Sequence, residues 1–302
     1  MSLREAIDSG KFLITSEVGP PKGTNIHHVL ADAELVRGRV DGVNVTDIQA
    51  SAMRLGSLAT CHLLVQAGFN PVFQMTCRDR NRLALQSDLL SAAVLGISDV
   101  LCLTGDYTTL GDHPAAKPVF DLDSVSLLRA AAGLMEGHDM AGNELDGKPD
   151  FTLGAVVNPG AEPLEPQIIK LEQKVEAGAR FVQTQAVYDP ASFERFVKAA
   201  SQIKVPILVG IVLLKSAGMA KYMNRNVAGV FVPDPLIEEM AQAGAADKAA
   251  KAEGKPAGNQ VKTSIDIAAR LVKELGPMVQ GAHIMPIGWD KHVPKVLDAA
   301  GL

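Results

Sequence analysis

The sequence has few cysteines, few aromatic residues and no excess of positive charge. Its three cysteines form no CxxC pair, which argues against a disulfide framework and indicates a reducing compartment. The net charge of −5 provides no basic face for nucleic acid or an anionic membrane. No apolar run approaches the roughly 20 residues of a membrane span, and MSLREAIDSGKF has no signal-peptide run. We therefore expect a cytoplasmic protein without nucleic-acid or membrane partners.

Apolar, β-branched runs recur along the whole chain, each followed by a helix-like segment. Most runs are apolar on both faces, as strands buried on both sides are. Hydrophobic residues make up 47% of the 302 residues, which is enough for a sizeable core. Eight strand–helix alternations predict an α/β fold, a single (β/α)8 TIM barrel over residues 1–302. An open doubly wound sheet is the alternative.

The predicted elements share this alternation from end to end. The strands are Lys11–Val18, Asp41–Asp47, Pro71–Cys77, Asp99–Gly105, Phe151–Val157, Arg180–Val187, Pro206–Val212 and Gly281–Gly288. The clearest helices are Ala50–Ala67, Arg82–Leu95, Val125–Ala132, Pro166–Ala177 and Pro190–Gln202. Gly68, Gly96 and Gly178 stand where helices should end.

Two segments do not fit the simple alternation. Tyr107–Asp121 is a long connection after the fourth strand, on the face where barrel loops build active sites. Met240–Gln260 is rich in Ala, Lys and Gly and is expected to form a frayed helix pair as a surface insertion. No GxGxxG follows a strand, so a nicotinamide-binding domain of the doubly wound type is not expected.

Polar residues cluster at the carboxyl ends of the predicted strands, where barrels place their active sites. Glu17 leaves the first strand before a stiff Gly-Pro-Pro turn, which makes it a candidate proton donor, with a solvated loop acid as the alternative. Other strand-end residues are Thr46, Asp47, Gln74, Thr76, Arg78, Asp79, Arg82, Thr104, Gly105 and Asp106, and Gln183 and Gln185 share one face of the sixth strand. Together they predict a site for a polar heterocycle, although a structural hydrogen-bond network explains any one of them equally well.

The cysteines and histidines predict neither a metal site nor a nucleophilic one. Cys77 and Cys102 offer only two thiolates with no HxxxH motif, so small buried cysteines are the preferred interpretation. Alternation places Cys102, but not Cys77, on the same face as its strand's polar residues. No Ser-His-Asp or Cys-His arrangement follows from the spacing.

These motifs occur in an order that resembles the methylenetetrahydrofolate reductase family in its short bacterial form. The resemblance runs nearly end to end, through SEVGPPKG, VTD, QMTCRDRNR, LTGD, KVEAGARFVQTQAVYD, PILVGIVLL and HIMPIGW. It implies a flavin-binding barrel that reduces 5,10-methylenetetrahydrofolate to 5-methyltetrahydrofolate in one-carbon metabolism. Hydride would pass from reduced flavin to the folate, with NAD(P)H or another reductant as the transient electron donor.

The resemblance also implies roles for matching residues. Glu17 matches the acid that opens the substrate's five-membered ring, and Asp106 the aspartate beside flavin and folate. Gln185 matches the glutamine that binds the pterin. The implied cofactor-binding residues are Thr46 on the flavin ring, Lys174 on the cofactor tail, and Gln74, Thr76, Thr104, Gly105, Asp106 and Asn158.

Five positions depart from the family's pattern. Gln74 and Asn158 stand where histidines are familiar, Gly154 where an aromatic residue is, and Thr104 and Trp289 where arginines are. The residues expected around the isoalloxazine ring are those of the family, whereas the residues expected around the adenosine half of FAD differ. The cofactor is therefore expected to be either FAD or FMN. Trp289 is either a core residue closing the barrel or a substrate-binding platform for the folate rings.

Two alternative functions remain at this stage. One is another TIM-barrel flavoprotein, of the proline-dehydrogenase type. The other is a catalytic subunit that needs a partner for electrons, because the chain has no nicotinamide domain of its own. We accordingly expect either a homo-oligomer or a complex with a redox partner subunit.

Overall fold

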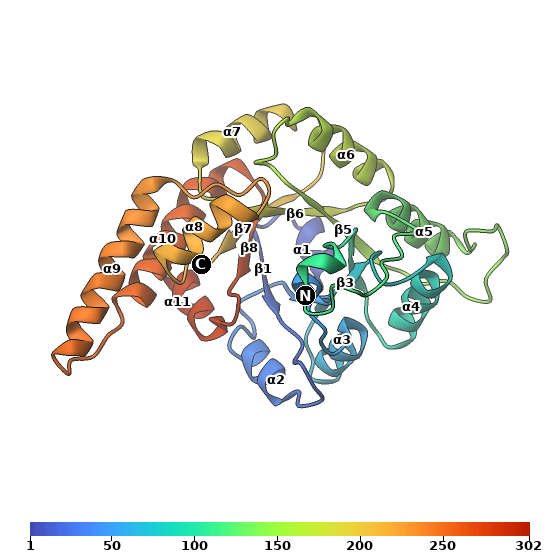
Figure 1. Cartoon of the computed structure of the whole chain (residues 1–302). Helices are drawn as coiled ribbons and strands as arrows, with labels where there is room; N and C mark the ends of the chain where they lie inside the picture. Colours follow the sequence, from blue (N-terminus) through green and yellow to red (C-terminus); the bar gives the residue numbers. More distant parts are fainter.

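The computed structural model describes residues 1–302 and forms a closed barrel of eight parallel strands. Each strand pairs with the next along the chain, and β8 closes the ring by pairing with β1. The helices surround this barrel (Figure 1). The predicted (β/α)8 barrel is confirmed, and the open doubly wound sheet is excluded because the sheet has no edge.

Every strand lies inside the range that the sequence predicts for it. The strands are β1 (Leu13–Val18), β2 (Gly42–Val45), β3 (Pro71–Thr76), β4 (Asp99–Leu103), β5 (Thr152–Val157), β6 (Phe181–Ala186), β7 (Ile207–Val212) and β8 (Gly281–Met285). The helices are α1 (Leu3–Asp8), α2 (His27–Glu34), α3 (Ser57–Gln66), α4 (Arg82–Val94), α5 (Ser124–Glu136), α6 (Glu165–Glu176), α7 (Pro190–Ala199), α8 (Ala217–Asn226), α9 (Asp234–Ala252), α10 (Asn259–Leu275) and α11 (Val293–Ala300).

The predicted helix Ala50–Ala67 is wrong in its first part. Gln49–Ser51 forms a short 3₁₀ turn, η1, in which Ala50 and Ser51 adopt left-handed backbone conformations. Left-handed residues cannot continue a right-handed helix, and the Leu55 N–H donates to the Pro21 carbonyl after β1. The helix α3 therefore begins only at Ser57, and the residues before it form a loop at the barrel mouth.

The two segments outside the alternation take different forms. Tyr107–Asp121 connects β4 to α5 and contains only the 3₁₀ turn η2 (Thr108–Leu110). Met240–Gln260 comprises the second half of α9 and the start of α10, a helix pair at the left of Figure 1. The Asp247 carboxylate accepts the N–H groups of Gly258, Asn259 and Gln260, and these bonds lower its pKa to about 2. These bonds cap the start of α10 and tie it to the middle of α9.

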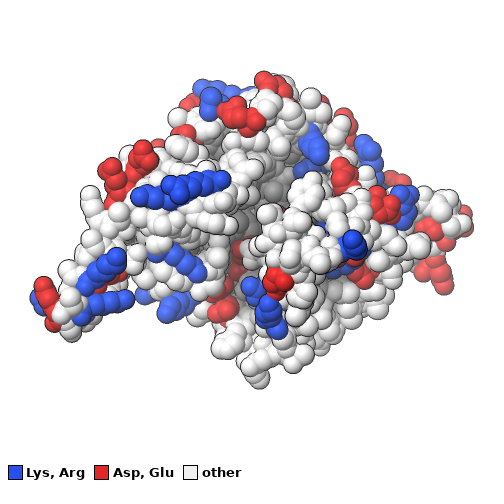
Figure 2. All heavy atoms as spheres, in the orientation of Figure 1, with Lys and Arg blue, Asp and Glu red and all other residues white.

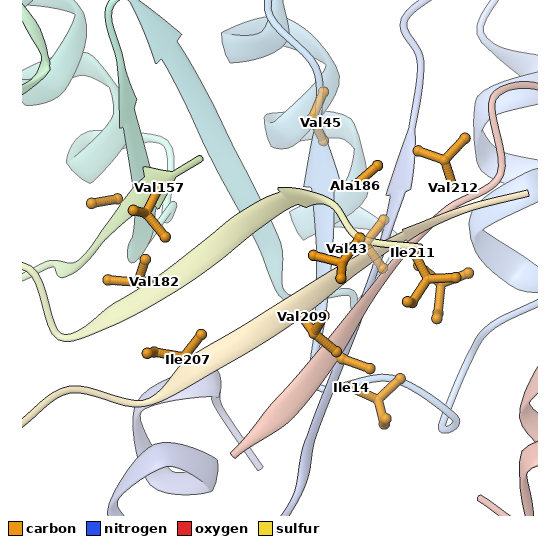
Figure 3. Close-up of a cluster of buried hydrophobic side chains, with 14 of the residues drawn as sticks. Ile14, Val43, Val45, Val157, Val182, Ala186, Ile207, Val209, Ile211 and Val212 are labelled. Carbon is orange, nitrogen blue, oxygen red and sulfur yellow. The ribbon is translucent and has the colours of Figure 1, made fainter. Parts of the chain in front are cut away.

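The barrel is apolar on its outer face and at its bottom. Outward-facing residues such as Ile14, Val43 and Val209 belong to the large cluster between strands and helices (Figure 3). Inside, a smaller cluster fills the amino-terminal end, where α1 covers the opening with Leu3 and Ala6. Its strand members are Leu13, Val72, Leu101, Phe181 and Leu208. This dry floor means that polar ligands reach the interior only from the carboxyl ends of the strands.

Asp99 begins β4 at this amino-terminal end of the barrel, where its carboxyl group is costly to ionise. Its side chain is buried, its Oδ2 has no hydrogen-bond partner, and burial raises its pKa to about 6. A carboxyl group whose pKa is higher in the folded than in the unfolded state binds more protons when folded. Folding stability therefore falls as pH rises through the window from about 4 to about 6.

We expect Asp99→Asn to remove this part of the pH dependence. The difference in unfolding free energy between variant and wild type should shift in favour of the variant by up to about 3 kcal/mol between pH 4 and pH 7. Denaturant unfolding at several pH values measures it. Asp150→Asn is the control, because hydrogen bonds from Arg4 lower the pKa of Asp150 and give the opposite slope. Parallel curves for wild type and Asp99→Asn would refute the assignment.

Candidate active site

A cavity of about 370 Å³ opens at the carboxyl ends of the strands. The molecular surface is hollowed near its centre on the face shown in Figure 2, with acidic atoms at the edge of the hollow. The cavity is lined by Glu17, Thr46, Asp47, Gln49, Gln74, Thr76, Arg78, Cys102, Leu103, Thr104, Gly105, Asp106, Ser124, Val156, Val157, Asn158, Gln167, Lys174 and Gln185. Most of these side chains are polar, and they come from six strands and the loops and helices that follow them.

All the residues predicted to be catalytic, cofactor-binding or substrate-binding, except Trp289, line this cavity. Of the other strand-end residues, Asp79, Arg82 and Gln183 do not line it. The ring of Trp289 instead packs edge-on against His292, with centroids 5.5 Å apart, and the Lys215 ammonium lies 5.7 Å from it. The backbone explains this placement, because Ile287 and Gly288 have positive φ and end the predicted strand Gly281–Gly288 early, at Met285. Trp289 is thus carried by a turn at the rim and not by the strand.

Asp47 lies in the wall of the cavity, after the carboxyl end of β2 and beside β3. Its buried carboxylate accepts the N–H and the hydroxyl of Thr76 and two bonds from the Arg80 guanidinium. Burial opposes ionisation, but the bonds and charge of Arg80 together with Thr76 hold the pKa of Asp47 below its usual range. This cluster fixes the end of β3 and so the positions of Gln74 and Thr76.

Arg78 is a cavity residue whose role the sequence did not predict. Its guanidinium is almost fully buried, pairs with Asp79 at 2.7 Å and donates to the Ser51 hydroxyl at 3.1 Å. The same hydroxyl donates to the carbonyls of Asp106 and Tyr107. Arg78 and Ser51 therefore hold the η1 turn against the Asp106 loop. Left-handed, non-glycine residues of this kind persist only where surrounding contacts enforce them.

Lys174 reaches the cavity from α6. Its ammonium donates to the Val156 carbonyl at 2.6 Å, and the side chain is largely buried. Burial, together with the positive charge of the nearby Lys170, lowers the pKa of Lys174 to about 8. A partly dehydrated cation at this end of the cavity suits an anionic group of a ligand.

Glu17 stands at the inner wall of the mouth with several ionisable neighbours. Its Oε2 lies 3.8 Å from the Nε2 of His283 on β8, and both side chains are buried. Asp290, which the sequence did not single out, lies close by. Burial, together with the Asp32 and Glu17 carboxylates, raises the pKa of Asp290 to about 6.

Two buried polar atoms in the cavity lack hydrogen-bond partners. They are the hydroxyl of Thr46 after β2 and the side-chain oxygen of Asn158 after β5. Buried polar groups are ordinarily satisfied, so these atoms indicate a ligand with polar edges. Cys77 and Cys102 are buried free thiols as predicted, and Cys102 alone of the two lines the cavity.

Neither a metal-binding cluster nor a membrane span is among the features of the structure. No group of three or more His, Cys, Asp or Glu side chains is arranged to hold a metal ion. None of the helices combines the length and the apolar character needed to cross a membrane.

A closed (β/α)8 barrel with a polar cavity at the carboxyl ends of its strands defines the class of small-molecule-binding barrel proteins. The sequence profile described as methylenetetrahydrofolate reductase matches residues 2–301. The chain belongs to the methylenetetrahydrofolate reductase family, as its motifs predicted.

Individual relatives agree with this assignment. Methylenetetrahydrofolate reductase 2 of Schizosaccharomyces pombe is 28% identical over 247 residues, which cover 76% of this chain and 35% of the yeast protein. A probable methylenetetrahydrofolate reductase (NADPH) of Caenorhabditis elegans is 24% identical over 203 residues, covering 66% of this chain and 28% of that protein. The chain thus aligns with about a third of the length of these curated relatives.

Solved structures share the fold at low sequence identity. A Clostridium thermocellum protein that binds two copies of 5-methyl-5,6,7,8-tetrahydrofolic acid superposes with a TM-score of 0.63 at 16% identity, over 99% of this chain and 98% of its own. An oxaloacetate acetylhydrolase superposes with a TM-score of 0.53 at 12% identity, over 97% of this chain and 81% of its own. These likenesses support the barrel fold alone.

Proposed function

We propose that the chain reduces 5,10-methylenetetrahydrofolate to 5-methyltetrahydrofolate, with a flavin held in the mouth cavity. The observation that carries the proposal is the meeting of Glu17, Asp106 and Gln185 in one cavity, although they come from three separate strands. Membership of the methylenetetrahydrofolate reductase family supports the same reaction.

The residues of the cavity fit a flavin. Bound flavin would supply the hydride. The unpartnered Thr46 hydroxyl and the amide or hydroxyl groups of Gln74 and Thr76 suit the polar edge of the isoalloxazine ring. Lys174 suits the phosphate that both FAD and FMN carry, and Asn158 offers an unpartnered acceptor beyond it. Thr104, whose hydroxyl accepts the Ser124 N–H at the start of α5, and Gly105 complete this wall.

Glu17 and Asp106 divide the acid–base work in this proposal. Glu17 protonates the substrate nitrogen, which opens the five-membered ring to a cationic iminium. The carboxylate left on Glu17 and that of Asp106 then stabilise this cation until hydride reaches the methylene carbon. Gln185 offers an amide to hydrogen-bond the pterin.

The rim offers contacts for the rest of the folate. Trp289 presents an indole face and Lys215 an ammonium beside it, outside the cavity proper. An aromatic face suits the aminobenzoyl ring, and a cation suits the glutamate carboxylates.

A cytoplasmic location and either a homo-oligomer or a complex with a redox subunit remain predictions.

The test begins with the absorbance spectrum of the purified chain and identification of any released cofactor by chromatography. A yellow protein releasing FAD or FMN supports the proposal and decides between the two. Folate reduction is then assayed with NADH, with NADPH and with an artificial reductant. Turnover with the artificial reductant alone identifies a subunit that depends on a partner for electrons. A colourless chain that neither flavin reconstitutes contradicts the flavin mechanism.

Lys174 makes flavin binding depend on pH. Because its pKa is about 8, the ammonium loses its proton between pH 7 and pH 9, and its attraction for a phosphate is lost with it. We expect the dissociation constant to rise by roughly tenfold over this range, as the loss of one charge-assisted hydrogen bond requires. Titration by flavin fluorescence at the two pH values measures it. In Lys174→Gln this dependence should disappear, and its persistence there would show that another group is responsible.

A further inference from the structure

A chain of buried polar side chains crosses the barrel interior directly below Glu17. It consists of Asn44 on β2, Gln183 on β6, Thr15 on β1 and His283 on β8, all less than 4% exposed. Bulky branched apolar residues ordinarily fill this part of a (β/α)8 barrel. Burying polar groups here is costly unless each is satisfied. This hydrogen-bonded network of four side chains therefore calls for an explanation beyond packing.

The hydrogen bonds of this chain have a fixed direction. The Gln183 amide donates to the Asn44 side-chain oxygen at 3.1 Å and to the Thr15 hydroxyl at 3.2 Å, while its oxygen accepts from Asn44 at 2.8 Å. The Thr15 hydroxyl, having accepted from Gln183, has one proton to donate. Its remaining partner is the Nδ1 of His283, at 2.9 Å.

This direction determines the tautomer of His283. Neutral histidine carries its proton on one ring nitrogen and accepts with the other. Because Nδ1 accepts from Thr15, the proton must reside on Nε2. The structure places Nε2 3.8 Å from the Oε2 of Glu17. The N–H is thus presented to the carboxylate.

We propose that His283 is a positioning residue for Glu17, which the Thr15–Gln183–Asn44 chain holds in the Nε2–H tautomer. Its catalytic consequence rests on the proposed function. When Glu17 gives its proton to the folate nitrogen, an O–H bond breaks, an N–H bond forms and a buried carboxylate remains. The Nε2–H of His283 stabilises that carboxylate and loses no proton itself.

The distance of 3.8 Å is longer than a hydrogen bond. Hydrogen bonds of this kind tighten when substrate binds, and only the charged form of Glu17 draws the N–H strongly. The contact therefore gains strength as the reaction proceeds, which is the condition for lowering the barrier. Asp290 also interacts electrostatically with Glu17, and Asp32 and Lys215 in turn act on Asp290. Asp290 is a carboxyl group that follows β8 and not a residue of the buried network, so it does not replace the N–H of His283.

Two substitutions at His283 separate positioning from structure. In His283→Gln an amide nitrogen takes the place of Nε2, and in His283→Asn an amide takes the place of Nδ1. Both are neutral and polar, and both lose part of the imidazole packing. We expect His283→Asn to lower kcat for folate reduction roughly 10- to 100-fold, the effect of one hydrogen bond to a charged group. His283→Gln should retain most of kcat, and flavin reduction should be unchanged in both. Equal losses in the two variants would overturn the proposal.

Nitrogen-15 NMR of histidine-labelled protein tests the tautomer without any reaction. His283→Gln assigns the His283 signals by their disappearance. The wild type should show a protonated Nε2 and a bare Nδ1, Thr15→Val should lose this preference, and Glu17→Gln should shift the Nε2 signal. A protonated Nδ1, or an Nε2 signal indifferent to Glu17→Gln, refutes the proposal. A wild-type chain that reduces no folate with any donor refutes the proposed function instead, and the NMR result then decides the His283–Glu17 contact alone.

Discussion

Glu17→Gln is expected to bind flavin and accept electrons normally, yet to reduce folate on the order of 10²- to 10⁴-fold more slowly, the usual contribution of a general acid. The amide is nearly isosteric with the carboxyl group, so the cavity keeps its shape. It has no proton to give to the substrate nitrogen and no charge to stabilise the iminium. Ring opening should therefore become the slow step.

Stopped-flow absorbance separates the two half-reactions of this variant. Flavin reduction by the electron donor should match the wild type, and flavin reoxidation by folate should show the whole defect. Glu172→Gln on the exposed face of α6 serves as the matched control and should leave both steps unchanged. Normal reoxidation in Glu17→Gln would exclude Glu17 as the acid. A defect in both half-reactions would instead indicate damage to the flavin site.

Asp47→Asn is expected to cost about 2 to 4 kcal/mol of folding free energy. Asp47 is fully buried and binds Arg80, whose side chain is 17% exposed. Removing one partner of a buried ion pair leaves the other charge uncompensated, and such losses typically amount to about 3 to 5 kcal/mol. The lower figure reflects the partial access of Arg80 to water.

The same guanidinium supplies the control for this prediction. Arg80 also pairs with Asp88, whose side chain is 33% exposed, at 2.9 Å. Asp88→Asn should cost less than about 1 kcal/mol, as exposed ion pairs do. Denaturant unfolding of the two variants measures the contrast. Equal costs would mean that Asp47 is stabilised mainly by its bonds to Thr76 and not by Arg80.

Low pH should lower the folding stability of the protein through Asp47. The pKa of Asp47 is lower in the folded state than its ordinary value. Its stabilising contribution is therefore complete above the unfolded pKa and is lost as pH falls through the folded one. This slope is opposite in sign to that of Asp99, so the two carboxyl groups can be distinguished in one pH series.

The sequence by itself determined the strands, the barrel and most of the residues that gather at its mouth. Strands buried on both faces appear as apolar runs, and polar residues at their carboxyl ends stand out against that background. Glu17, Thr46 and Asp106 were recognisable for this reason, and parallel strands of a closed barrel bring their carboxyl ends to one rim.

Only the tertiary structure decided how far along the barrel axis each inward-facing side chain lies. Alternation places Gln183 and Gln185 on the same inward face but does not say which of them reaches the cavity at the mouth. The tilt and stagger of the strands put Gln183 in the interior network and Gln185 in the cavity. The pairing of Gln183 with Asn44 and Thr15 depends on strands far apart in the sequence, so it leaves no local pattern.

The backbone conformation at the rim of the barrel also depends on tertiary contacts. Ser51 adopts its left-handed conformation because Arg78 and the Asp106 loop hold it, and helical periodicity could not reveal that constraint. Trp289 seemed to end a strand, but the positive φ of Ile287 and Gly288 turns it away from the cavity. Sequence patterns report which face a side chain takes within an element. Contacts between distant segments fix where the element ends and what that side chain meets.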